Sequence, residues 1–537
     1  MAKSAGKKKR ISLKEKRKSD LKRKKKKHLK NAKSSPPSPQ QQTLDTLLGF
    51  YQTGQFEHAE KLAARITEKF PKHQFAWKVL GAILKQTERV HESVIANRKS
   101  VQLAPQDPEA HFNLGNTFKM VSRLDEAEKC FRQAIALQPH YAEAYNNLGN
   151  TLKEKNKLID AKTNFRQAIS LHPEYAEAHF NLGFIYQEIG SSEEAETEYR
   201  KAIALRSNFA EAHSNLGNAL REQGRLEEAK VSLDQALSLR PDFTEALMSR
   251  WQVLFDQEKF DAALEDADRC NTEVSRACGL ETLYALGRHN EIYRRIRASA
   301  ELDDQNIRTA AFSCFISEIK SEDTAHNFCR NPMRFLQFSN VSSHLENSQG
   351  FLEELIEELK NIDTVWQPAK KTTINGFQTR TDINLFRIGY RRINQLESII
   401  MKELDRYHLK FQNDPCSFIK KWPSKKVLNG WHVILKTQGH QDSHIHADGW
   451  LSGVIYLQVV PALENQEGAI EFSLGGVNYS HPNVPRLIYQ PELGDIVFFP
   501  SSLHHRTIPF TTDSERIVIS FDLIPQARAD LANSISQ

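Results

Sequence analysis

A repeat of 34 residues runs through the first half of this 537-residue chain and constrains its fold more than any other feature. A Leu-Gly pair recurs five times at this interval, and its glycines are Gly81, Gly115, Gly149, Gly183 and Gly217. An alanine follows four of these glycines after twelve residues, and a proline follows four of them after 24 residues. Small residues let two helices approach closely, and a proline breaks the connection to the next helix. The spacing therefore predicts stacked pairs of antiparallel helices.

This pattern resembles the tetratricopeptide repeat, which has the same period of about 34 residues. Seven units in register extend over about residues 40–277. The resemblance implies a right-handed superhelix of helix pairs with a concave groove. Residues 278–325 have a helical pattern out of register with the repeat. We expect them to cap the array and connect it to the second half of the chain.

Asparagines recur two residues before four of the glycines, as Asn113, Asn147, Asn181 and Asn215. Helical spacing places them on one face of the first helix of each pair. Their amides can donate to and accept from a peptide backbone. Similar asparagine ladders hold extended peptides in the repeat domain of O-linked N-acetylglucosamine transferase. A protein or peptide partner in the groove is therefore expected, although asparagine is also common in such repeats without binding anything in particular.

The second half of the chain changes character after about residue 326. Short β-rich runs separated by turn residues occur there without intervening helices, at 430–437, 451–460, 469–474, 495–500 and 516–524. Such a series predicts an antiparallel sandwich or barrel over residues 326–537. Two amphipathic segments, 351–360 and 393–411, are expected to form helices beside a sheet.

Histidines and an aspartate with the spacing of metal ligands stand between these predicted strands. His446 and Asp448 are two residues apart and would point to one side of an extended chain. With His505 or His504 they supply two imidazoles and one carboxylate, which leaves positions open on a ferrous ion. His444 lies on the same predicted face, so His444, His446 and His505 form a second allowed set. The set with Asp448 is preferred because a carboxylate offsets the ferrous charge.

Arg516 follows His505 by eleven residues and lies on the last predicted strand. On that strand it shares a face with Val518 and Ser520. A guanidinium group can bind a carboxylate through two hydrogen bonds, so this stripe suits a dicarboxylate cosubstrate. Tyr456 could add a hydroxyl group to the same pocket, but a role as an ordinary core residue is equally consistent with its position.

The order of these residues resembles the Fe(II)/2-oxoglutarate-dependent dioxygenases with a double-stranded β-helix core, over about residues 427–525. The resemblance implies that His446, Asp448 and His505 bind Fe(II), and that Arg516 binds the C5 carboxylate of 2-oxoglutarate, with O2 as the other cosubstrate. His505 is preferred to His504 because it fits the spacing after Phe499-Pro500-Ser501. The expected fold is an all-α tetratricopeptide solenoid followed by an antiparallel jelly roll with flanking helices.

The resulting functional hypothesis is a hydroxylase whose repeat groove selects a protein or peptide substrate. Two alternatives stay open. The chain could be a repeat scaffold with a non-catalytic oxygenase-like domain. It could also be an oxygenase that acts on a small molecule or a nucleic acid.

Charge is concentrated at the N-terminus. Residues 1–34 contain 17 Lys and Arg and two acidic residues, a net charge of +15, whereas the remaining chain has 56 basic and 65 acidic residues. Residues 1–39 are predicted to be a disordered basic tail and linker. Three roles are open for this segment: a nuclear address, a contact for nucleic acid or another polyanion, or only a solubilising segment.

The absence of a long apolar run predicts no membrane segment or secretory signal. With six scattered cysteines, an intracellular location, cytoplasmic or nuclear, is expected.

Overall fold

The computed structural model describes residues 38–368, 371–380, 383–461 and 465–525. The predicted basic tail lies outside the described residues apart from Ser38 and Pro39. The described residues fall into two compact units, which divide between residues 151 and 152. Within the described residues, every helix is too short or too polar to cross a lipid bilayer.

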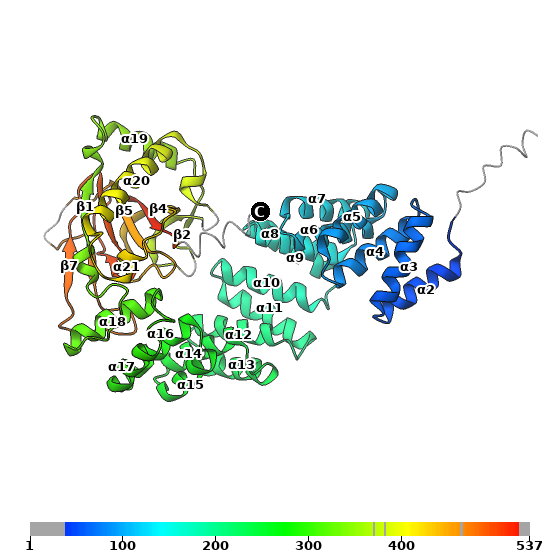
Figure 1. The fold of residues 1–537 in the computed structure, drawn as a ribbon, viewed down its shortest axis with the longest axis horizontal. Coiled ribbons are helices and arrows are strands. Elements are labelled where there is room, and N and C mark those ends of the chain that lie inside the picture. The colour runs from blue at the N-terminus through cyan, green and yellow to red at the C-terminus, as the bar shows by residue number, and fades with distance from the viewer. Residues whose placement is uncertain (1–37, 369–370, 381–382, 462–464, 526–537) are drawn as a thin grey trace, which may run out of the picture. The chain divides into compact units, whose positions relative to one another are not determined.

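The helical repeats form a solenoid of paired helices, as the 34-residue period predicts (Figure 1). The first unit contains α2 (Gln41–Gln52), α3 (Phe56–Lys69), α4 (Gln74–Gln86), α5 (Val90–Leu103), α6 (Pro108–Met120), α7 (Leu124–Leu137) and most of α8 (Ala142–Glu154). The second unit continues with α9 (Leu158–Leu171), α10 (Ala176–Glu188), α11 (Ser192–Leu205), α12 (Ala210–Glu222), α13 (Leu226–Leu239), α14 (Thr244–Asp256) and α15 (Phe260–Cys270).

The repeated glycines allow the two helices of a pair to touch. A Cβ atom added at Gly183 on α10 would lie 2.8 Å from the ring of Tyr199 on α11. A Cβ atom at Gly217 on α12 would lie 2.6 Å from Cγ of Leu233 on α13. Tyr199 and Leu233 are completely buried. The large residue sixteen positions after each of these glycines therefore fills the space that the missing side chain leaves.

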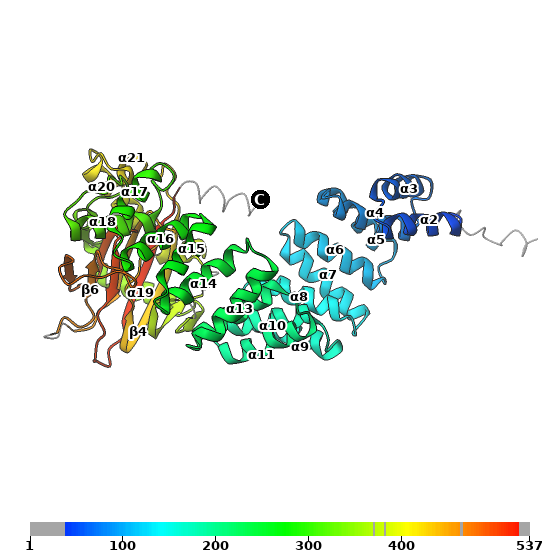
Figure 2. The ribbon, with the colours of Figure 1, turned by 90° about the horizontal axis from the view of Figure 1, so that it is seen from below.

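Three further helices follow the repeats: α16 (Glu273–Ala285), α17 (His289–Ala298) and α18 (Ile307–Lys320). Phe312 and Phe315 on α18 pack on the ring of Tyr479, with centroids 5.0 and 4.8 Å apart. Apolar residues of these helices share one core with the interior of the β-domain, and Figure 2 shows α16 and α18 beside its strands. The segment that the sequence predicted as a cap and connector is thus built into the β-domain.

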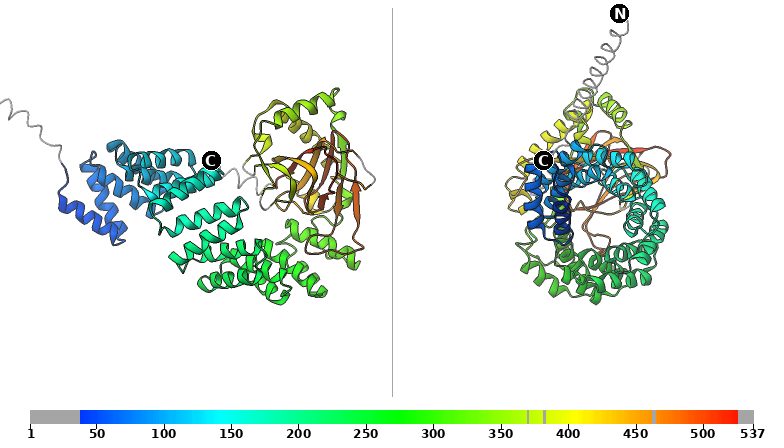
Figure 3. Two further views of the ribbon diagram at one scale, coloured as in Figure 1. Left: turned by 180° about the vertical axis from the view of Figure 1, so that it is seen from behind. Right: turned by 90° about the vertical axis from the view of Figure 1, so that its right-hand side faces the viewer.

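The β-domain consists of antiparallel strands in two sheets (Figure 3). The larger sheet has the order β1-β8-β5-β10-β4-β3-β2, and the smaller has the order β7-β6-β9. The strands are β1 (Gln337–Asn340), β2 (Thr364–Trp366), β3 (Thr373–Thr379), β4 (Leu428–Gln441), β5 (Leu451–Gln458), β6 (Ile470–Ser473), β7 (Arg486–Tyr489), β8 (Asp495–Pro500), β9 (His504–Thr507) and β10 (Arg516–Leu523). This arrangement agrees with the expected jelly roll.

The larger sheet has two different faces. Ile517, Ile519 and Phe521 of β10 join the core beneath α19 (Ser348–Leu359) and α20 (Arg391–Phe411), while Val518 faces the interior between the sheets. The alternation predicted for this strand is therefore present. The short helix α21 (Ser417–Lys420) and three 3₁₀ turns, η1 (Pro332–Phe335), η2 (Val341–Ser343) and η3 (Leu385–Arg387), complete the domain.

Replacement of Gly183 by alanine should destabilise the second unit, because the new methyl group would collide with the buried Tyr199 ring. Overpacking of this kind costs about 1–3 kcal/mol. Gly49 on α2 is the matched control, since a Cβ atom there meets no atom within 4 Å. Gly49→Ala should be neutral or stabilise its helix by up to about 1 kcal/mol. Urea unfolding followed by circular dichroism measures both, and equal midpoints for the two variants would refute the packing role of Gly183.

Candidate metal centre

Three histidines come together where the loop after β4 meets β9. His444 and His446 follow the end of β4 at Gln441, and His505 lies on β9. The backbones of His444 and His505 form an isolated antiparallel bridge, with both N–H···O distances 3.1 Å. One ring nitrogen from each of the three histidines lies within 4.8 Å of the other two. Backbone pairing thus places three imidazoles around one point.

His446 is oriented by a buried carboxylate. Its Nδ1 lies 2.5 Å from Oδ1 of Asp522 on β10, and the hydroxyl group of Ser452 on β5 donates to the same oxygen at 2.6 Å. An Nδ1–H that donates to Asp522 leaves the Nε2 lone pair of His446 available for a metal. Such carboxylate–histidine pairs fix the orientation of metal-binding rings and raise their basicity.

The other two histidines are oriented by backbone carbonyl groups. Nδ1 of His444 lies 2.6 Å from the carbonyl oxygen of Asp442, and Nδ1 of His505 lies 3.3 Å from that of Leu503. The Nε2 atoms of His444 and His446 are 3.3 Å apart. All three rings therefore have an acceptor at Nδ1, which favours the tautomer with an available Nε2.

Burial keeps His444 and His505 neutral. Desolvation, together with the neighbouring imidazole of His446, lowers the pKa of His444 to about 4. Burial, together with the imidazoles of His444 and His446, holds the pKa of His505 well below its usual value. A neutral imidazole is the form that binds a metal ion, so the rings of His444 and His505 are in the binding form at neutral pH. The arrangement fits a divalent ion that prefers nitrogen ligands.

Asp448 lies outside this group of histidines. The chain is no longer extended after His446, because residues 446–449 form a turn in which the N–H of Gly449 donates to the carbonyl of His446 at 2.9 Å. The alternation that would place His446 and Asp448 on one face needs an extended strand. The Asp448 side chain is exposed and lines the cavity in front of the histidines. The structure thus brings His444 together with His446 and His505, and the ligand role of Asp448 stays a prediction.

His504 is directed elsewhere. Its Nε2 lies 2.8 Å from the hydroxyl group of Tyr479, in line with the alternation of neighbouring residues along β9. Burial, with the charges of nearby residues, lowers the pKa of His504 to about 3. Of the two histidines that the sequence offered for this position, only His505 belongs to the group of three.

Arg516 is a buried cation with free hydrogen-bond donors. It is 2% exposed, and its Nε and Nη1 donate to no atom of the described residues. The guanidinium carbon lies 5.0 Å from the centroid of the Tyr456 ring. Burial raises the pKa of Tyr456 to about 12 and lowers that of Arg516. Ser520 is also buried and lies on the same strand. Because an unpaired buried charge is costly, these donors fit a carboxylate ligand.

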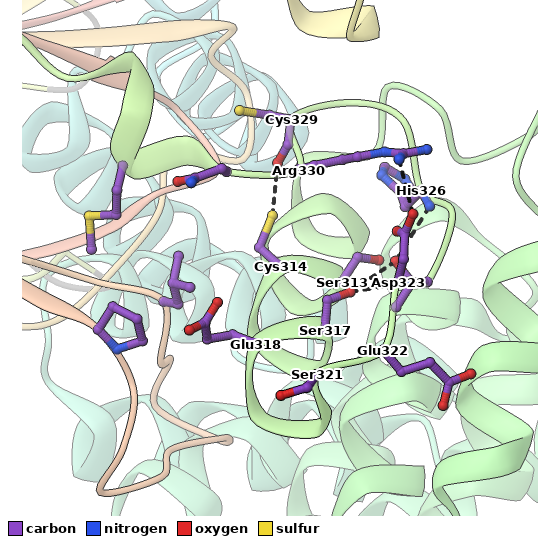
Figure 4. A pocket seen from close by; sticks show the side chains of 15 residues that line it. Ser313, Cys314, Ser317, Glu318, Ser321, Glu322, Asp323, His326, Cys329 and Arg330 are labelled. Atoms are coloured by element: carbon purple, nitrogen blue, oxygen red, sulfur yellow. Dashed lines mark hydrogen bonds and ion pairs between the residues drawn. The ribbon is translucent and has the colours of Figure 1, made fainter.

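A cavity of about 490 Å³ opens onto His444 and His446. Its wall includes the end of β3, the loop after β4, Trp431 and Arg308 from α18. A second cavity of about 460 Å³ lies between α18 and the segment that leads to β1 (Figure 4). There the Cys314 thiol lies 2.8 Å from the Cys329 carbonyl oxygen, and His326 is the one histidine in the lining. The two cavities share no lining residue, and only the first has the histidine group.

Three residues of the site escaped the sequence analysis: Asp522, Ser452 and Arg308. Asp522 and Ser452 are register partners on β10 and β5. In the sequence, each is recognisable only as a polar residue within an apolar strand. The strand pairing is needed to show that the two residues lie side by side. Arg308 lies 136 residues before His444 in a helix assigned to the cap, so no local motif connects it to the site.

Comparisons with family models agree with both halves of this description. The model described as Putative 2OG-Fe(II) oxygenase matches residues 429–522. Models of the tetratricopeptide repeat match residues 108–141, 130–163, 149–190, 188–220 and 210–243. The chain thus contains tetratricopeptide repeats and a C-terminal domain that matches this oxygenase family.

Solved structures that resemble the chain include tetratricopeptide-repeat proteins. The APC/C hetero-tetramer Cut9-Hcn1 is 17% identical, with a TM-score of 0.40, over 44% of this chain and 48% of that one, so the chain spans about half of its length. A repeat protein from Parabacteroides merdae is 14% identical, with a TM-score of 0.38, over 45% of this chain and 98% of that one. YrrB, described as a TPR protein with an unusual peptide-binding site, is 20% identical, with a TM-score of 0.30, over 34% of this chain and 95% of that one. No curated protein matches the chain.

Asp522→Asn should weaken divalent-metal binding about 10–100-fold, because the variant keeps the shape of the side chain but removes the charge that orients His446. The affinity is measured by titration with Co(II) and its visible absorption. Asp495→Asn is the matched control, since Asp495 is equally buried, at 7% exposure, but is bound by Tyr489 and the backbone of Glu492. Equal affinities in the two variants would contradict the role of Asp522.

Proposed function

We propose that this chain, with its tetratricopeptide repeats and its domain of the 2OG-Fe(II) oxygenase family, is an Fe(II)- and 2-oxoglutarate-dependent dioxygenase that hydroxylates a protein or peptide. The observation that carries the proposal is the convergence of His444, His446 and His505, each with an acceptor at Nδ1. When bound, Fe(II) and 2-oxoglutarate supply the oxidation of a C–H bond by O2, with succinate and CO2 as the other products.

His446 and His505 are the ligands common to both possible sets. The third position in our proposal is His444, because its ring lies in the group of three while Asp448 lies in an exposed turn. Three neutral imidazoles do not compensate the charge of a divalent ion. An anionic cosubstrate bound beside them would do so.

Arg516 is proposed to bind the distal carboxylate of 2-oxoglutarate. Its two free donors match the geometry of a carboxylate, and burial excludes competing water. Tyr456 holds the guanidinium group by ring contact, and Ser520 offers a hydroxyl group on the same strand face. These residues orient the cosubstrate and hold its charge within the β-domain.

The repeats are proposed to select the substrate through their asparagines. Asn113, Asn147 and Asn215 are partly exposed, whereas Asn181 is buried. Asn147 donates to the side-chain oxygen of Asn116 at 2.7 Å, so neighbouring repeats of the first unit present linked amides. Such amides can exchange these bonds for bonds to a peptide backbone.

Metal binding distinguishes the two possible ligand sets. His444→Ala, His446→Ala and His505→Ala should each lose at least about tenfold in Co(II) affinity, because each removes one of three ligands. Asp448→Ala should retain the wild-type affinity. His440→Ala is the matched control, since His440 lies in the same segment but outside the group. Loss of binding in Asp448→Ala with retention in His444→Ala would instead establish the set with the carboxylate.

Turnover tests the oxygenase proposal itself. Purified protein with Fe(II) should release succinate from 2-oxoglutarate. Arg516→Met should raise the dissociation constant for 2-oxoglutarate at least about 30-fold while Co(II) affinity stays unchanged, because it removes a buried charge pair with the cosubstrate. Arg486→Met, at an exposed arginine of β7, is the control. Binding of metal and 2-oxoglutarate without succinate release, across candidate peptides, would favour a non-catalytic scaffold.

A further inference from the structure

The cavity in front of the histidines has basic residues on its wall from separate parts of the chain. Arg308 comes from the first turn of α18, Lys371 precedes β3, and Arg380 follows β3. Arg308 and Lys371 are exposed. The chain outside residues 1–34 has more acidic than basic residues. This local excess of positive charge is therefore opposite in sign to the charge of the folded body.

Arg380 is paired with a carboxylate, whereas Arg308 and Lys371 are not paired with one in the described residues. Arg380 donates to the carbonyl oxygen of Asn156 at 3.0 Å and lies 3.6 Å from the carboxylate of Asp363. Across the described part of the chain, Arg308 and Lys371 form no ion pair with a carboxylate. The positive charge of these two side chains is thus available to a ligand in the cavity.

Two of the acidic groups near these cations, Asp522 and Glu281, are engaged with other partners. Asp522 accepts from His446 and Ser452 and is directed to the histidines. Glu281 lies near enough to Arg308 for their charges to interact, but it accepts from Asn478 at 2.8 Å, and burial raises its pKa. Asp448 is the remaining carboxylate on the wall.

We infer that the segment entering this cavity is an acidic peptide, with Asp or Glu side chains next to the position presented to the metal centre, and that Arg308 and Lys371 recognise those carboxylates. The inference rests on the proposed function and names its substrate class. A cavity of about 490 Å³ accommodates a few residues of an extended chain. Guanidinium and ammonium groups at its rim steer and orient such a segment.

A peptide is favoured over a nucleic acid by the elements that form the wall. Arg308 belongs to α18, which packs on Tyr479 and shares its core with the last repeat helices. The protein-binding array and the cavity are therefore joined through one packed element. Trp431 is the one aromatic residue other than histidine in the lining, whereas binding of single strands relies on successive stacking platforms.

Photo-crosslinking to the full chain tests this inference without requiring metal or turnover. The probes are a 12-residue peptide of Glu-Gly-Ser repeats with a central benzophenone, its Gln-Gly-Ser counterpart, and a photoreactive 12-nucleotide oligo-dT. Mass spectrometry locates the labelled segments. The acidic peptide should label residues 371–380 and 429–448 at least about tenfold more than the neutral peptide, because only it carries the carboxylates that the cavity wall recognises.

The double variant Arg308→Glu with Lys371→Glu should lower this labelling about tenfold, to the level of the neutral peptide. The matched control is Arg391→Glu with Lys420→Glu, which reverses an exposed arginine and lysine outside the cavity and should retain the labelling. If the first double variant unfolds, Arg308→Gln with Lys371→Gln replaces it, with an expected decrease of about threefold.

Three results would overturn the inference: equal labelling by acidic and neutral peptides, labelling confined to the basic N-terminal segment, or preferential labelling of the cavity by the oligonucleotide. The last result would assign the cavity to a nucleic acid instead. A chain that binds the acidic peptide but releases no succinate would refute the proposed activity alone. A chain that releases succinate but does not discriminate between the peptides would refute the substrate class alone.

Discussion

The two backbone hydrogen bonds between His444 and His505 are the contact on which the rest of the site depends. They join β9, a strand of the smaller sheet, to the loop that follows β4, a strand of the larger sheet. Without this bridge, imidazoles from segments 61 residues apart in sequence would not share one point. The large apolar interior between the sheets supplies the stability that holds the bridge, because the bridge itself is only a pair of hydrogen bonds.

Two charged groups are buried near this bridge, and they differ in whether their hydrogen bonds are satisfied. Asp522 is buried but accepts from His446 and Ser452, so the cost of its desolvation is offset and one ring is oriented. Arg516 is buried with two free donors, a cost that the fold retains and that a bound carboxylate would remove. The satisfied carboxylate of Asp522 positions a ring, whereas the guanidinium group of Arg516 has two donors unused by the described residues.

Packing of α18 gives the chain a second level of organisation. Phe312 and Phe315 enter the same core as Tyr479, so the helices after the repeats are structural parts of the β-domain. The same helix brings Arg308 to the wall of the cavity in front of the histidines. A change that moves α18 would therefore alter both the end of the repeat array and the entrance to the histidines, so the two parts are physically connected.

Local features of this protein could be predicted from the order of its residues. The 34-residue period predicted the helix pairs because glycine and alanine recur wherever two helices touch, and alternation predicted that Arg516 and Val518 share a strand face opposite to Ile517. Local patterns also identified His446 and His505 as candidate ligands. Short strands such as β1, β2 and β9 carried too weak a pattern to be recognised. The sequence left the third position open between Asp448 and His444. Only the folded chain shows that the ring of His444 lies beside the other two, because the turn after His446 ends the alternation on which the preference for Asp448 rested. Folding alone brought Arg308 and Asp522 to the site, since contacts between distant segments depend on strand order and helix packing, which leave no local signature in the sequence.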